Sequence, residues 1–225
     1  MVYTVAGFLF GLLIPYMARR FSKFMPATPA YAIYRLIMPV KTTKKAKSDA
    51  KYKKLCKKYL MRSIGYAIIC AVLSQMVVHN FEANLWWYLI FVWVLLLLSE
   101  IDIRMFILPD ILVIPLLIAG FVFASLSDCG SAADSALGAA FGYIMPVVAT
   151  LLMLWRSKDA FGGGDIKLLA AIGAWLGVAG VIYTILLSCL VFGVYSLARR
   201  QRAGAFGPSL AVSAVAVLLF FYKFI

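Results

Sequence analysis

The chain has 225 residues, of which 64% are hydrophobic and 14% are charged. A soluble domain usually carries about a quarter charged residues, so the excess apolar side chains cannot all be buried in one core and must face lipid. The net charge of +13 would suit a nucleic-acid-binding protein, but the positions of the basic residues along the chain argue against that class.

Long apolar runs predict an all-α, polytopic membrane protein, because backbone that faces lipid must form its hydrogen bonds within a helix. The eight predicted spans are roughly 2–18, 63–79, 84–101, 110–127, 136–155, 165–177, 180–198 and 207–224. In the first run, Arg19 and Arg20 follow the apolar stretch, whereas the basic residues of a signal peptide precede it. We therefore expect this first span to be retained.

The basic residues predict the orientation of the spans. The hydrophilic segment 19–62 contains 14 of the 22 Lys and Arg residues, and such residues accumulate on the cytoplasmic side of a membrane. If the chain crosses at every span, 21 of the 22 fall on that side and only Lys223 on the other. We therefore expect a first span (1–18), a small basic cytoplasmic segment (19–62) and a seven-span core (63–225), with both termini outside.

The segment 41–58 is the most basic part of the chain, with nine lysines and a single acid, Asp49. It could contact anionic lipid or a substrate, at about 1 kcal/mol for each basic residue near such a surface. The simpler alternative, which we favour, is a solvated loop that sets the topology.

Cysteine and histidine provide little for catalysis or metal binding. The four cysteines form no CxxC pair, and two of them, Cys70 and Cys189, lie within apolar spans, so neither a disulfide framework nor a zinc site is expected. The single histidine, His79, is predicted on the outer side, away from the acidic residues, which argues against Ser–His or Cys–His catalysis. We expect a site without metal or other cofactor.

Two acidic sites remain, both at predicted cytoplasmic ends of spans: Glu100–Arg104 closes the third span, and Gly162–Lys167 opens the sixth. Acidic residues at membrane depth are costly, so each site is a functional candidate. The alternative for Asp102 is an interfacial ion pair with Arg104, which would contribute only about 0–1 kcal/mol. Glu100 is a weaker candidate, because it lies two residues before Asp102 and faces another side of a helix.

Two neighbours of these sites have structural alternatives. Asp110 follows Pro109 at a predicted helix start, where a carboxylate can cap the helix and interact with its dipole, and we favour this role over catalysis. The run Gly162–Gly164 lacks the Lys-Ser/Thr of a phosphate-binding loop, but it would let backbone approach Asp165 closely. A flexible turn would explain these glycines without explaining the acid that follows them.

The sixth span is too short to cross a bilayer fully. From Asp165 to Gly177 it covers about 20 Å of helix against a hydrocarbon core of about 30 Å, so we expect Asp165 to lie in a recess. Two carboxyl groups in such a recess share one proton, which suits aspartyl peptide hydrolysis: one activates water and the other polarises the scissile carbonyl. We assign Asp165, near a helix N-terminus, as the base of the resting pair.

At these residues the chain resembles the type IV prepilin peptidases, over roughly residues 60–225. The matching motifs are Asp102-Ile103-Arg104 through Leu108-Pro109-Asp110, Gly162-Gly163-Gly164-Asp165-Ile166-Lys167-Leu168-Leu169 with its continuation to Gly177, and Phe206-Gly207-Pro208. The resemblance implies a polytopic aspartyl peptidase whose catalytic pair is Asp102 and Asp165. The substrate-binding or supporting residues would be Gly162, Gly164, Lys167, Arg104 and Asp110.

The chain departs from this family's pattern in its basic segment. Many bacterial members carry two CxxC pairs after the first span, linked to N-methylation of the trimmed pilin, whereas 19–62 contains only Cys56. Zinc binding and methylation are therefore in doubt, and S-adenosylmethionine would be a cofactor only if methylation is retained. Pro15 and Ala205 also replace a usual Asn and a common Pro, but neither change touches the aspartate pair.

These features predict a leader peptidase of the bacterial inner membrane that cuts prepilin or pseudopilin substrates at the cytoplasmic face. Its expected partners are these substrates, membrane lipid and the pilus or secretion assembly machinery, and not nucleic acid. One alternative is a proton- or cation-coupled transporter that uses the same acids as a relay. Relay acids should lie near the bilayer midplane, whereas both acids here lie toward one face. Another alternative is a catalytically silent assembly protein.

Overall fold

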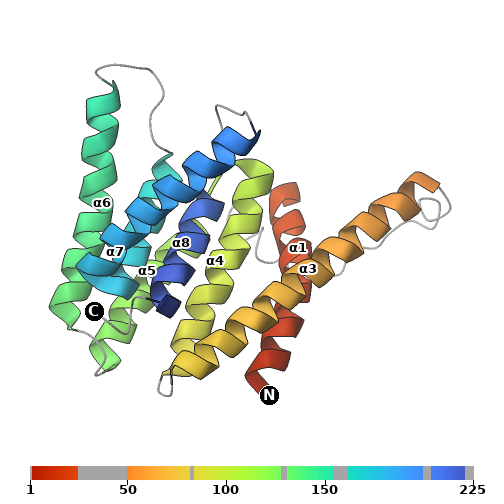
Figure 1. Cartoon of the computed structure of the whole chain (residues 1–225), viewed down its shortest axis with the longest axis horizontal. Helices are drawn as coiled ribbons and strands as arrows, with labels where there is room; N and C mark the ends of the chain where they lie inside the picture. Colours follow the sequence, from red (N-terminus) through yellow and green to blue (C-terminus); the bar gives the residue numbers. More distant parts are fainter. Residues whose placement is uncertain are drawn as a thin grey trace. The chain divides into compact units, whose positions relative to one another are not determined.

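The computed structural model describes residues 2–24, 50–81, 84–127, 131–154, 162–199 and 204–220, and within these ranges every regular element is a helix (Figure 1). The predicted all-α fold is thereby confirmed. The helices are α1 (Val2–Phe24), α3 (Ala50–Asn80), α4 (Leu85–Met105), α5 (Asp110–Leu126), α6 (Ala132–Leu154), α7 (Gly163–Arg199) and α8 (Gly207–Phe220). The segment 41–58, which could contact anionic lipid or a substrate, lies largely outside the described residues.

Five of these helices, α1, α3, α4, α6 and α7, are long and apolar enough to cross a membrane, while α5 and α8 are apolar but shorter. By length and composition the chain is therefore a multi-pass membrane protein. Each of the eight predicted spans falls largely within a helix, with the sixth and seventh together in α7. That the chain crosses the membrane eight times stays a prediction.

The chain divides into two compact units, residues 1–85 and 86–225. In the first unit, α1 packs against α3 through two glycines one helical turn apart, Gly7 and Gly11. A Cβ at Gly11 would lie only 2.5 Å from the Cα of Ala67, and a Cβ at Gly7 would meet the Ser74 side chain. Small residues at this spacing let two apolar helices approach closely.

Helix α7 of the second unit is broken at Gly177, which has φ 71° and ψ −174°. The predicted end of the sixth span coincides with this break, and Figure 1 shows the two halves of α7 running in different directions. A side chain at Gly177 would meet the Asp134 carboxylate, and the N–H of Val178, where the second half begins, donates to Asp134 Oδ1 at 3.4 Å. Glycine is thus required here for both its backbone conformation and its small size.

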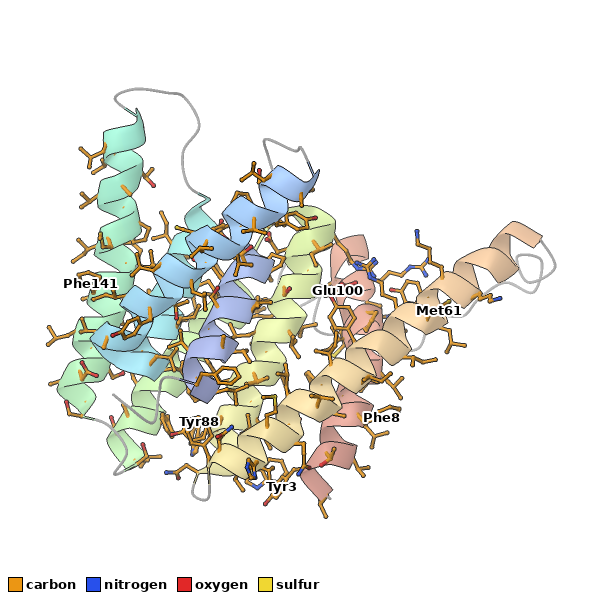
Figure 2. All side chains as sticks on the ribbon, viewed as in Figure 1. Tyr3, Phe8, Met61, Tyr88, Glu100 and Phe141 are labelled. Atoms are coloured by element: carbon orange, nitrogen blue, oxygen red, sulfur yellow. The ribbon has the colours of Figure 1, made fainter. Side chains whose placement is uncertain are left out.

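An aromatic cluster holds the first half of α7 in place. Trp175 stacks on Phe91 of α4 and Phe123 of α5, with ring centroids 4.9 and 5.3 Å apart. Its indole N–H also donates to the Leu116 carbonyl at 2.8 Å. Tyr88, at this end of α4, packs edge-on against Phe123, and Figure 2 shows Glu100 toward the other end of the same helix. The cluster therefore joins three helices at a distance from the acidic residues.

Candidate active site

A cavity of about 200 Å³ contains both candidate aspartates. Its walls come from Asp102 near the end of α4, from residues 106–108 that follow this helix, and from the start of α7 with the residue before it (162–165). The two carboxylates are close enough for their charges to interact. The structure thus brings together the two acidic sites that the sequence places far apart along the chain.

Asp102 lies in the last turn of α4 and is only 5% exposed. Its Oδ2 accepts a hydrogen bond of 2.9 Å from the backbone N–H of Gly207, the first residue of α8. Arg104 pairs instead with Glu100, one turn earlier, at 2.6 Å between Nη2 and Oε1. The ion pair between Asp102 and Arg104, considered from the sequence, is therefore not the arrangement found, because Arg104 reaches back along its own helix.

The backbone after Asp102 leaves the helix abruptly. The N–H of Phe106 still donates to the Asp102 carbonyl at 2.8 Å, but Phe106 itself has φ 54°, in the left-handed region. Residues 107–109 form no regular secondary structure, and the backbone of Pro109 is extended, with φ −74° and ψ 127°. Phe106 and Ile107 consequently expose 67% and 52% of their surface beside the carboxylates. Sequence reasoning did not single out these two residues, whose only signal is apolar character next to a proline.

Asp165 is half-buried in the first turn of α7, where it meets the positive end of the helix dipole. The Gly162 carbonyl accepts the N–H groups of Asp165 and Ile166, at 3.0 and 3.3 Å, and so starts the helix. A Cβ at Gly162 would lie 2.9 Å from Asp165 Oδ2, and a Cβ at Gly164 would lie 2.9 Å from the Cβ of Leu108. These two glycines leave room for the Asp165 carboxylate and for the backbone and side chain of Leu108.

Lys167 and Asp110 form an ion pair of 2.6 Å that connects the first turns of α7 and α5. Both side chains are about half exposed, at 45% and 53%. The expected cap at Asp110 is wrong: the N-cap position is Pro109, and no side chain caps the helix there. Asp110 has already entered the helix, where its carboxylate meets Lys167, although it still lies near the positive end of the dipole.

The chemistry available in this cavity is that of a carboxyl pair. Within the described ranges, no three His, Cys, Asp or Glu residues gather in a way that could hold a metal ion. Two carboxyl groups that line one cavity can share a proton, so that one can act as acid and the other as base. The assignment of Asp165 as the base of the resting pair stays a prediction.

Comparison with known proteins matches the part of the chain that contains both aspartates. The model of the type IV leader peptidase family matches residues 89–197. Among curated proteins, the prepilin leader peptidase/N-methyltransferase of Stutzerimonas stutzeri is 37% identical over 164 residues, which are 68% of this chain and 56% of that protein. The enzyme of the same name from Pseudomonas aeruginosa is 40% identical over 139 residues, or 58% of this chain and 48% of that protein.

A third relative with this name, from Aeromonas salmonicida, is 35% identical over 139 residues, or 58% of this chain and 48% of that protein. The chain thus spans about half the length of the curated relatives it matches. No solved structure is significantly similar to it. Both aspartates of the cavity lie inside residues 89–197, the segment that matches the type IV leader peptidase family.

Proposed function

We propose that this protein is an aspartyl endopeptidase that removes the leader from type IV prepilin-like proteins. The observation that carries the proposal is the shared cavity, in which Asp102 from α4 and Asp165 from α7 meet. The family match at residues 89–197 and the names of the relatives support leader cleavage as the reaction.

The carboxyl pair supplies both proton transfers that peptide hydrolysis needs. The ionised carboxylate takes a proton from the attacking water, while the protonated one donates a hydrogen bond to the scissile carbonyl. The protonated carboxyl group then gives its proton to the departing amine, while the other keeps the proton taken from water, so the pair again holds one proton. No metal or organic cofactor is needed for these steps.

The proposed substrate carries a short basic leader before an apolar helix, and it is cut at the cytoplasmic face of the bacterial inner membrane. The concentration of Lys and Arg in 19–62 supports this orientation. Exposed apolar side chains at Phe106 and Ile107 beside the carboxylates would contact the substrate around the cut. We propose pilus or secretion assembly proteins as further partners, since they would receive the trimmed product.

The test is cleavage of a prepilin-like substrate by membranes that contain the wild-type protein, Asp102→Asn or Asp165→Asn. We expect the wild type to cut and both variants to lose cleavage. Asp134→Asn is the matched control: Asp134 accepts the Val178 N–H, which an asparagine oxygen can also accept, and it does not line the cavity. The product masses also report whether a methyl group is added.

Equal insertion of all four proteins must be checked in the same membranes. If either Asp102→Asn or Asp165→Asn cuts as fast as the wild type, the catalytic pair is wrong. The transporter, in which the same acids relay protons or cations, then becomes the better account.

A further inference from the structure

We infer that the N-terminus of α8 positions Asp102 for catalysis through the backbone N–H of Gly207. The N–H donates to Asp102 Oδ2 at 2.9 Å, and both residues are buried. The inference rests on the proposed peptidase function. It adds a residue from outside the matched segment 89–197 to the catalytic arrangement.

Asp102 needs such a partner because of where it lies on its own helix. The last turn of α4 leaves carbonyl groups without helical donors, and the negative end of the helix dipole disfavours a carboxylate there. Arg104, two residues away, is engaged with Glu100. The start of α8 supplies what α4 does not, because the first N–H groups of a helix are free to bind an anion.

The beginning of α8 is organised so that Gly207 presents its N–H. The Phe206 carbonyl accepts the N–H groups of Ser209 and Leu210, at 3.0 and 3.1 Å, which fixes the first turn. Pro208 has no N–H to offer, so Gly207 carries the donor closest to Asp102. An N–H group at the start of α8, which has no partner within its own helix, thus forms a hydrogen bond with a buried carboxylate oxygen of α4.

Glycine at this position is required by the closeness of the contact. A Cβ at Gly207 would lie 2.7, 3.0 and 3.1 Å from Oδ2, Cγ and Cβ of Asp102. Its φ is not in the left-handed region, so the backbone conformation alone would accept alanine. Any side chain here would therefore displace the Asp102 carboxylate or the start of α8.

The two oxygens of Asp102 therefore have different roles. Oδ2 is held by Gly207, which restricts rotation of the carboxyl group and leaves Oδ1 for water or the scissile bond. Gly207 is a positioning residue that acts through Asp102. A catalytic group displaced by about 1 Å can lose on the order of 10²-fold in rate, so we expect the turnover number to depend on this one contact.

The first test measures kcat and KM separately for Gly207→Ala in the full chain in membranes, with a prepilin-like substrate. We expect kcat to fall roughly 10- to 100-fold with KM nearly unchanged, because Gly207 is buried and does not line the cavity. The matched control is Gly193→Ala in α7, where a Cβ would meet nothing within 4 Å. It should keep the wild-type kcat.

The second test removes the hydrogen bond without adding a side chain. Replacing Gly207 by glycolic acid converts its N–H into an ester oxygen, and we expect kcat to fall about tenfold with KM unchanged. A wild-type kcat for this ester variant overturns the inference, as does a loss that lies only in KM. If the wild-type protein itself cuts no prepilin-like substrate, the proposed function fails, which is a different result from a normal rate in the Gly207 variants.

Discussion

The two aspartates of the cavity lie at opposite ends of their helices, and they are supported in different ways. Asp165 opens α7, so the dipole of its own helix favours its negative charge. Asp102 closes α4, where the dipole opposes it, and it takes a hydrogen bond from the start of α8 instead. The pair thus combines a helix end that disfavours a carboxylate with a helix start that favours one, and α8 supplies a hydrogen bond only to the first.

The largest effect should come from removing either member of the pair. Asp102→Asn and Asp165→Asn should each lower the cleavage rate by about 10³-fold or more, because general acid and general base act on the same bond. The double variant should be no slower than the slower single variant, since residues that act as a unit are not additive. Initial cleavage rates of the two single variants and the double variant in the same membranes check this. If the two losses multiply in the double variant, the two aspartates do not act as a catalytic pair.

The support of Asp165 can be disturbed by one methyl group. Gly162→Ala places a Cβ 2.9 Å from Asp165 Oδ2, so we expect the cleavage rate to fall roughly tenfold or more through displacement of the carboxylate. Gly163→Ala is the matched comparison, because a Cβ there meets nothing within 4 Å. Its loss should be distinctly smaller, and equal losses in the two variants would mean that the glycine run acts through flexibility.

The far end of the half-helix that carries Asp165 depends on Gly177. Gly177→Ala forces a side chain into φ 71° and against Asp134, so we expect a loss of about 1–3 kcal/mol in the free energy of unfolding. Thermal unfolding of the purified protein in detergent measures it, with Gly193→Ala as control. If the midpoint of thermal unfolding is unchanged in Gly177→Ala, the backbone at the break in α7 accommodates a side chain without loss of stability.

Much of this arrangement could be predicted from the sequence, because lipid imposes simple rules on composition. Apolar runs locate the helices, and they predict the end of the sixth span at Gly177, the residue where α7 breaks. The two acids at span ends identify the members of the cavity. These predictions depend only on the order of apolar and acidic residues within each segment, and tertiary packing does not change that order.

Contacts between distant segments could not be predicted in the same way. Nothing in the order of residues shows that the N–H of Gly207 reaches Asp102, or that Arg104 turns to Glu100. The same holds for Asp110, whose carboxylate meets Lys167 where local rules predict a cap. In each case an isolated helix offers several partners for the polar group, and only tertiary packing selects among them.

The smallest effect concerns the ion pair outside the cavity. Lys167 and Asp110 connect the first turns of α7 and α5, so the pair could steady the Asp165 side of the site, but both side chains are about half exposed. We expect Lys167→Met and Asp110→Asn each to change the cleavage rate only a few-fold, with a coupling of about 1 kcal/mol or less in a double-variant cycle. The coupling should weaken further at high salt. A coupling that resists salt, or a loss as large as that of Asp165→Asn, would mean that the pair contacts the substrate directly and belongs to the site itself.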